Sequence, residues 1–206
     1  MLTKKQIKIL NIFAREEFKE YSFKEVKKMS CENSTSIIQN AIKAFLKEDL
    51  IKEKKIGTSK LYSLNHANDR IYAYFEVYIK ENLPKQVKYS LSLIKEELDK
   101  HTCFYSLIIF GSYASNKQNK NSDLDIAVFI DKDENKKIVE ASLKSSELKS
   151  FLKIDGHVIT SKEFLEMLKG EAENLGKQIA RKHLIINNHS IFYSLLNEGI
   201  KNGFRI

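Results

Sequence analysis

The sequence has little proline, little glycine and no long apolar run. Its 206 residues include one proline and seven glycines, a composition unlike that of disordered or low-complexity chains. The longest apolar stretch near the middle, Leu107 to Phe110, is far too short to span a bilayer. The first residues lead into a charged, periodic segment and not into an apolar signal core. We therefore expect a cytoplasmic protein with no membrane partner.

Cysteine is also scarce, and the share of hydrophobic residues is typical of a globular protein. Cys31 and Cys103 lack metal-type spacing, and a structural disulfide is unusual in the cytosol. We expect both to be plain buried or half-buried residues. Hydrophobic residues make up 42% of the chain, enough to fill the core of one large domain or two small ones.

The net charge of +8 is distributed unevenly along the chain. Residues 1–66 contain 14 Lys/Arg against 8 Asp/Glu, a net +6, whereas residues 67–206 contain 21 against 19, a net +2. A concentration of positive charge favours a polyanionic partner for the first third. A solvated lysine-rich face is the alternative, and composition does not separate the two.

The first 66 residues are predicted to form three helices followed by a hairpin. Apolar residues fall near helical spacing over 3–18, and a Ser22–Glu25 capping box starts a second helix through Met29. A third helix contains the stripe Ile37 to Leu46 and ends near Asp49. Strand-like segments at 50–54 and 60–64 flank a turn with glycine. This order of elements resembles the winged helix-turn-helix fold.

The resemblance implies a nucleic-acid surface on the third helix and the hairpin, since such domains place that helix in the major groove of DNA. The residues that it assigns to the helix surface are Ser34, Thr35, Ser36, Gln39, Asn40 and Lys43, and those on the wing are Lys54, Lys55 and Lys60. A winged helix that binds protein or dimerises is the alternative.

Residues 67–101 are predicted to form a helical connector. Tyr72 to Ile79 has helical spacing, Pro84 interrupts the run, and Val87 to Leu98 continues as a second helix. The aromatic-rich first helix is interpreted as a packing or homodimer surface. The resulting domain plan is 1–66, 67–101 and 102–206.

The last segment is predicted to be a small mixed sheet flanked by helices, so the fold class of the chain is α+β. The predicted strands are 105–110, 124–130 and 154–160, and the predicted helices are 134–152, 163–168, 175–183 and 190–198.

A glycine–serine pair and two carboxylates carry the chemistry of this segment. The first predicted strand ends at Gly111, where glycine allows a sharp turn and a close approach to a ligand. Ser112 would open a short helix, whose free N–H groups suit a triphosphate. Asp123 and Asp125 stand at i and i+2 where the next strand begins, so both lie on one face. Adjacent carboxylates repel unless a cation lies between them, and oxygen ligands of this kind suit Mg²⁺.

This pattern resembles the minimal type of the polymerase beta-like nucleotidyltransferase superfamily, over roughly residues 105–200. The resemblance implies an enzyme of the 2.7.7 class that uses an NTP, with Gly111 and Ser112 binding the nucleotide and Mg²⁺ or Mn²⁺ held by Asp123, Asp125 and a third carboxylate. Asp155 is the favoured third carboxylate and the candidate base, because it lies on the polar face of a predicted strand. Asp131 and Asp133 are the rivals, although they look like turn residues.

The chain departs from the family pattern after the serine. Many relatives carry Arg and then Gly there, whereas this chain has Tyr113 or Ser115 and then Asn116, which tolerates a left-handed turn. One phosphate contact of the family therefore lacks its usual arginine in this chain. The basic residues that could replace it are Lys117, Lys120, Lys177, Arg181 and Lys182.

Two functions follow as hypotheses. The first is transfer of AMP from ATP to a hydroxyl of a protein or other acceptor, targeted by the winged helix; the resemblance implies an antitoxin-like enzyme that adenylylates a tyrosine of a helical toxin. The second is a DNA-binding transcriptional regulator whose transferase domain senses nucleotides with little or no turnover.

Overall fold

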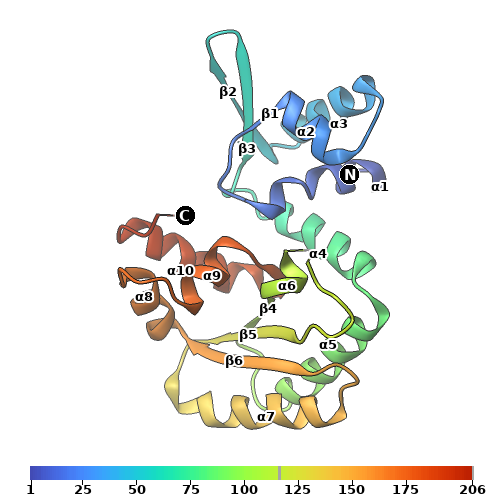
Figure 1. Cartoon of the computed structure of the whole chain (residues 1–206). Helices are drawn as coiled ribbons and strands as arrows, with labels where there is room; N and C mark the ends of the chain where they lie inside the picture. The colour runs from blue at the N-terminus through green and yellow to red at the C-terminus, as the bar shows by residue number, and fades with distance from the viewer. Residues whose placement is uncertain (116, 206) are drawn as a thin grey trace. The chain divides into compact units, whose positions relative to one another are not determined.

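The computed structural model describes residues 1–115 and 117–205 of the chain. Contacts divide it into two compact units, Met1–Glu81 and Asn82–Ile206. It is a mixed α+β protein with two small sheets (Figure 1). The boundary between the units lies at the end of α4 (Arg70–Asn82), before α5 (Lys85–Leu98), inside the range predicted as a helical connector.

The first unit contains three helices and a three-stranded sheet besides α4. Its strands are in the order β1-β3-β2, and both pairs are antiparallel. The hairpin turns at Gly57, whose φ is +59°, and the Ser22–Glu25 capping box starts the second helix as predicted. The elements are α1 (Lys4–Leu10), β1 (Tyr21–Ser22), α2 (Phe23–Ser30), α3 (Thr35–Lys47), β2 (Ile51–Ile56) and β3 (Ser59–Leu64).

The helix predicted over residues 3–18 is shorter than expected. It ends at Leu10, and Phe13–Arg15 form a separate 3₁₀ turn. Ile12 and Phe13 are nevertheless buried. The prediction was wrong because apolar spacing reports which side chains are buried, whereas a helix also needs continuous i to i−4 hydrogen bonds.

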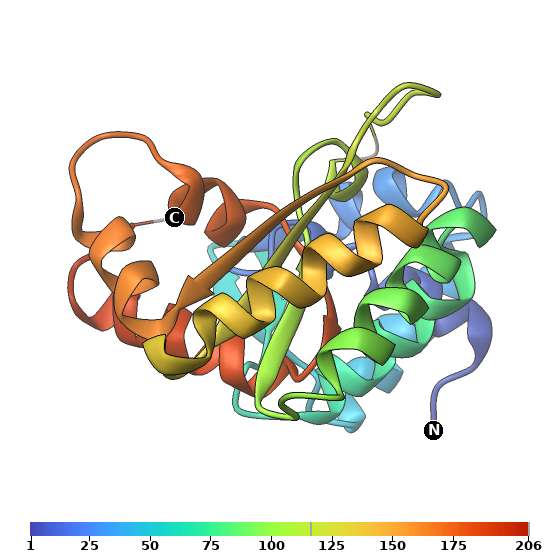
Figure 2. The same ribbon diagram turned by 90° about the horizontal axis from the view of Figure 1, so that it is seen from below.

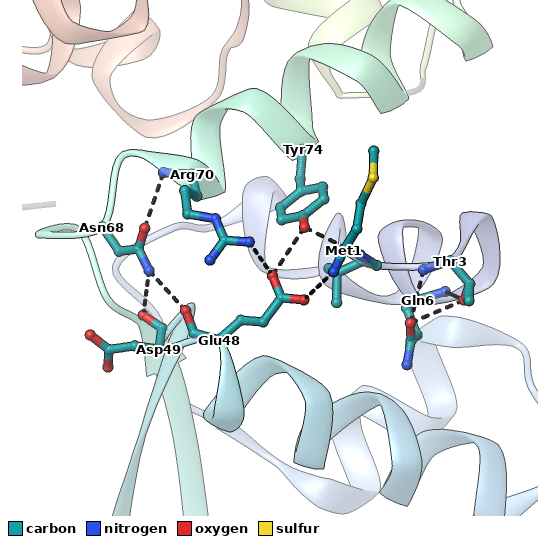
Figure 3. Close-up of polar contacts among 9 residues, drawn as sticks. Met1, Thr3, Gln6, Glu48, Asp49, Asn68, Arg70 and Tyr74 are labelled. Atoms are coloured by element: carbon teal, nitrogen blue, oxygen red, sulfur yellow. Dashed lines mark hydrogen bonds and ion pairs between the residues drawn. The ribbon is translucent and has the colours of Figure 1, made fainter.

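A polar cluster around Glu48 links the end of α3 to the start of α4 (Figure 3). The Glu48 carboxylate lies 3.0 Å from the Met1 amine and 2.7 Å from Arg70, and it accepts a hydrogen bond from Tyr74 at 3.0 Å. The Asn68 amide donates to the Glu48 carbonyl at 3.0 Å. Burial acts to raise the pKa of Glu48, but the hydrogen bonds and positive charges hold it below its ordinary value. This ionised side chain therefore joins three segments of the unit.

The second unit is built around a four-stranded mixed sheet. The strand order is β6-β5-β4-β7; β5 and β6 are parallel, and β4 is antiparallel to both of its neighbours. Helices α5 and α7 pack together beside β6 on one face, and α8 and α10 cover the other (Figures 1 and 2). The elements are β4 (Tyr105–Ile109), α6 (Gly111–Ala114), β5 (Leu124–Ile130), a 3₁₀ turn (Asp133–Asn135), α7 (Lys136–Lys149), β6 (Ile154–Thr160), α8 (Ser161–Lys169), α9 (Leu175–Arg181), β7 (Leu184–Asn187) and α10 (His189–Lys201).

Aromatic packing under the second face holds this sheet to its helices. The rings of Phe129, Phe164 and Phe192 lie 4.9–5.6 Å apart and are fully buried. The expectation for the cysteines was wrong, because Cys31 and Cys103 are both exposed; they lie in the turn after α2 and in the loop before β4, outside the apolar stripes that fill the cores. Among the described residues, no helix is long and apolar enough to cross a membrane.

Candidate active site

Gly111 lies where β4 ends, directly against Asp125. Its φ of +64° belongs to the left-handed region, and a Cβ atom there would lie 1.9 Å from Asp125 Oδ2. Backbone conformation and space therefore both require glycine. The Ser112 N–H at the start of α6 donates to the same Oδ2 at 3.4 Å. The glycine–serine pair and the second carboxylate of the motif are thus one local unit.

The pairing of β5 with β6 brings Asp155 beside Asp125. The two strands are parallel, and Asp125 and Asp155 are register partners. Side chains of register partners point to the same face of a sheet. Asp131 and Asp133 follow the opposite end of β5, so of the three candidates for the third carboxylate the structure places Asp155 beside Asp125.

Each of the three carboxylates also has a partner of its own. Asp123 forms an ion pair of 2.5 Å with Lys153, and Asp155 Oδ1 lies 3.2 Å from His157 Nε2. Burial raises the pKa of Asp125; the Ser112 N–H opposes this rise, whereas the neighbouring carboxylates of Asp155 and Asp123 add to it. Negative charge is therefore crowded where β5 and β6 begin.

The three carboxylates have the donor chemistry of the predicted metal site, but their side chains are not arranged around a single ion. Three carboxylates are the hard oxygen ligands that Mg²⁺ and Mn²⁺ take. As the side chains stand, no three His, Cys, Asp or Glu within the described part of the chain are grouped so as to hold one ion. The interactions with Lys153, His157 and Ser112 direct the three carboxylates to other partners.

A basic pocket of about 410 Å³ adjoins the glycine–serine pair, and none of the three aspartates lines it. It is lined by Gly111 and Ser112, by Ser115 and Lys117 of the following loop, and by residues of the α9 region that include Arg181 and Lys182. Glu173 and Gln178 also line it and carry no local signal in the sequence. Arg181 makes two 2.8 Å hydrogen bonds to the Glu173 carboxylate. Asn116, expected to take the left-handed turn of this loop, lies outside the described residues.

Lys177 does not join this pocket. Its side chain is buried, and its ammonium group donates to the carbonyl oxygens of Gly170 and, at 3.1 Å, Glu171. It therefore closes the loop between α8 and α9. Lys120 is exposed and does not line the pocket either. Of the five basic candidates, the structure brings Lys117, Arg181 and Lys182 to the glycine–serine pair.

The residues predicted to contact nucleic acid lie on α3 and the hairpin of the first unit. Ser36, Gln39, Asn40 and Lys43 form an exposed stripe, and Ser34 is the half-buried N-cap. A groove of about 510 Å³ lies between this helix and the hairpin. The wing residues are all exposed; Lys54 pairs with Glu20 at 3.3 Å, Lys60 pairs with Glu53 at 3.0 Å, and Lys55 is the cross-strand partner of Lys60.

Comparison with known proteins identifies the second unit by family. Residues 92–194, half of the chain, match the polymerase beta nucleotidyltransferase family. The match spans the Gly111–Ser112 pair and all three aspartates. The chain belongs to this family and carries a nucleotidyltransferase domain. No curated protein matches the sequence.

Two solved structures show weak similarity. A toxin–antitoxin crystal structure with AMP-PNP is 18% identical, covers 53% of this chain and 83% of its own, and has a TM-score of 0.36. TrmBL2, an archaeal chromatin protein with a novel mode of DNA binding, is 13% identical over 100% of this chain and 95% of its own, with a TM-score of 0.28. Scores this low do not establish a common fold.

Proposed function

We propose that the second unit transfers a nucleoside monophosphate, AMP from ATP, to a hydroxyl group of a protein acceptor. The observation that carries the proposal is the contact of Gly111 with Asp125, which in turn is the register partner of Asp155. Gly111 thus borders both a basic pocket and the Asp125 carboxylate. This arrangement suits a triphosphate beside a group that removes a proton.

The residues of the site have separate roles in this reaction. The acceptor oxygen bonds to the α-phosphorus while the bond from that phosphorus to the β-phosphate oxygen breaks, so pyrophosphate leaves and the hydroxyl proton passes to Asp155. Ser112, Lys117 and Lys182 line the pocket assigned to the triphosphate. Mg²⁺ or Mn²⁺ bound by Asp123, Asp125 and Asp155 would supply neutralising charge for both oxygens. His157, 3.2 Å from Asp155, orients the base.

The decisive test is transfer of label from ATP. The full chain is incubated with Mg²⁺, ATP labelled at the α-phosphate and mixed protein and RNA acceptors, and pyrophosphate and labelled acceptor are measured. We expect Asp125→Asn to lose at least about 100-fold of the activity. The matched control, Asp131→Asn, changes an exposed carboxylate at the other end of β5 and should keep it.

Other outcomes contradict the proposal in distinct ways. Equal turnover by Asp125→Asn and the unchanged chain would remove the carboxylates from the mechanism. Binding of ATP without turnover on any acceptor would favour a nucleotide-sensing regulator instead. An acceptor protein such as a helical toxin, modified on tyrosine, is the partner that the family resemblance suggests.

We further propose that the first unit is a winged helix that brings the enzyme to DNA. The supporting observation is at the tip of its hairpin, where Lys55 and Lys60 face each other across the strands. Glu53 already pairs with Lys60 at 3.0 Å, so a phosphate bound at this tip would meet two exposed ammonium groups and compete with one carboxylate. The exposed Ser36, Gln39 and Lys43 offer hydrogen-bond donors on α3. Salt-dependent DNA binding tests this role.

A further inference from the structure

The strand that carries Asp155 is an open edge with a long groove beside it. β6 is the last strand of the order β6-β5-β4-β7. A groove of about 740 Å³ is lined by seven consecutive residues, Lys153 to Ile159, together with residues of α7, α8 and α9. A cavity that touches every residue of a strand in turn runs along its edge, since a cavity over one face would touch alternate residues.

Backbone groups along this edge are oriented toward the groove. The Leu124 N–H donates to the Lys153 carbonyl at 2.8 Å, so Lys153, Asp155 and His157 direct their backbone groups to β5. Alternation then directs those of Ile154, Gly156 and Val158 away from β5. Thr160 belongs to this second set, and its N–H is indeed taken by a side chain, that of Glu163, at 2.9 Å.

The groove lacks the excess of positive charge that a polyanionic ligand such as RNA would need. Its lining includes five carboxylates, those of Asp123, Glu140, Glu147, Asp155 and Glu163, against three ammonium groups, those of Lys136, Lys144 and Lys153. If Asp123 and Asp155 are set aside as ligands of a cation, three of each sign remain. Nucleic-acid sites need an excess of positive charge. The basic pocket next to Gly111 has that excess, with three basic residues against one carboxylate.

We propose that the groove beside β6 is the acceptor site, and that the acceptor is an extended polypeptide segment added to the edge of the sheet. The inference rests on the proposed transferase function and names its substrate class. An added strand lies about 4.8 Å from β6. The side chain opposite Asp155 then reaches the carboxylate at cross-strand distance. A serine, threonine or tyrosine hydroxyl at that position gives its proton to Asp155, bonds to the α-phosphorus of ATP and displaces pyrophosphate.

Amide hydrogen exchange of the full chain tests the mode of binding without turnover. The probe is the peptide Lys-Val-Lys-Tyr-Lys-Val-Lys, added to the ¹⁵N-labelled protein and followed by NMR. We expect the amides of Ile154, Gly156 and Val158 to exchange at least about tenfold more slowly, whereas those of Asp155 and His157, already directed to β5, change little. The same peptide N-methylated on alternate backbone nitrogens, and a seven-nucleotide single-stranded RNA, should give no protection.

Charge variants give a second, independent measurement. Glu140→Lys with Glu147→Lys reverses two exposed charges on the α7 wall of the groove and should weaken peptide binding at least about tenfold. Glu198→Lys, an exposed change on α10 outside the groove, should leave binding unchanged. Absence of protection with millimolar peptide, or equal protection by the RNA, overturns the proposal. In the label-transfer assay, labelled RNA without labelled peptide would overturn this proposal and the protein acceptor, while leaving nucleotidyl transfer itself intact.

Discussion

The surroundings of Asp125 disfavour its ionised form. Burial raises its pKa, and the carboxylates of Asp155 and Asp123 reinforce that rise against the Ser112 N–H. In the unfolded chain the pKa returns to the ordinary aspartate value, about 3.9. Above the raised pKa the ionised side chain therefore lowers the stability of the fold, and this penalty is relieved as pH falls through the raised value toward the ordinary one.

Asp125→Asn should consequently stabilise the protein at neutral pH. Asparagine keeps an oxygen to accept from Ser112 and removes the charge. We expect a higher Tm than that of the unchanged chain at pH 7, with the difference shrinking as pH falls through the raised pKa. Thermal unfolding across this pH range, with exposed Asp131→Asn as the control of equal charge change, measures it. A lower Tm for Asp125→Asn at neutral pH would show that the carboxylate is not repelled.

At the scale of elements, two lysines at α9 look alike in the sequence but have different surroundings in the fold. Lys177 is buried and donates to the Gly170 and Glu171 carbonyls, whereas Lys182 is exposed and lines the basic pocket. Lys177→Met should cost about 2 kcal/mol of unfolding free energy, because its charged hydrogen bonds are lost. Lys182→Met should leave stability within about 0.5 kcal/mol and weaken ATP binding about tenfold.

Urea unfolding and calorimetric ATP titration of both variants measure these effects. The two changes are matched, since each removes one ammonium group from the same short segment. A loss of ATP affinity at constant stability in Lys177→Met, or a large loss of stability in Lys182→Met, would reverse the assignments.

Helices and strands with a clear apolar pattern can be predicted from the sequence. Short strands that form only because they pair with another strand cannot. The predicted strands at 124–130 and 154–160 are confirmed. Residues 126–130 form a continuous apolar run, as in a buried strand, whereas residues 154–160 mix buried apolar residues with the polar Asp155 and His157 on one face. The strand β7 (Leu184–Asn187) carries no such signal in the sequence. Four residues are too few to show a period, and this segment is a strand because it pairs with β4. The two-residue β1 likewise exists through its pairing with β3.

At the scale of the whole molecule, the site combines local spacing with distant pairing. Gly111, Ser112, Asp123 and Asp125 follow from one short segment. Asp155 could be inferred from its place on a strand, but its register with Asp125 depends on the crossover through α7. Lys117, Arg181 and Lys182 of the basic pocket could be named as candidates from the sequence. The sequence does not separate Lys182 from Lys177, because one is exposed and the other is buried only through the tertiary fold. The Lys153 ion pair that redirects Asp123 is a tertiary contact as well, since the two residues lie 30 positions apart.

The uneven charge of the chain leads to a prediction about its two units together. Residues 1–66 hold +6 of the net +8, and each phosphate contact contributes about 0.9 to the salt dependence of DNA affinity. Lys55→Glu with Lys60→Glu should therefore weaken duplex DNA binding and lower that salt slope by about two. ATP binding should stay unchanged, since the basic pocket belongs to the second unit.

Electrophoretic mobility shifts over a range of salt concentrations measure the slope. The control is Lys4→Glu with Lys8→Glu on α1, an equal charge change in the same unit. Each pair of lysines also includes one that forms an ion pair: Lys4 lies 3.8 Å from Glu81, and Lys60 lies 3.0 Å from Glu53. Equal weakening by both pairs would mean that only net charge matters and that the wing has no special role. Absence of binding at low salt would leave the first unit as a surface for proteins, because α3 would then have no polyanion to contact.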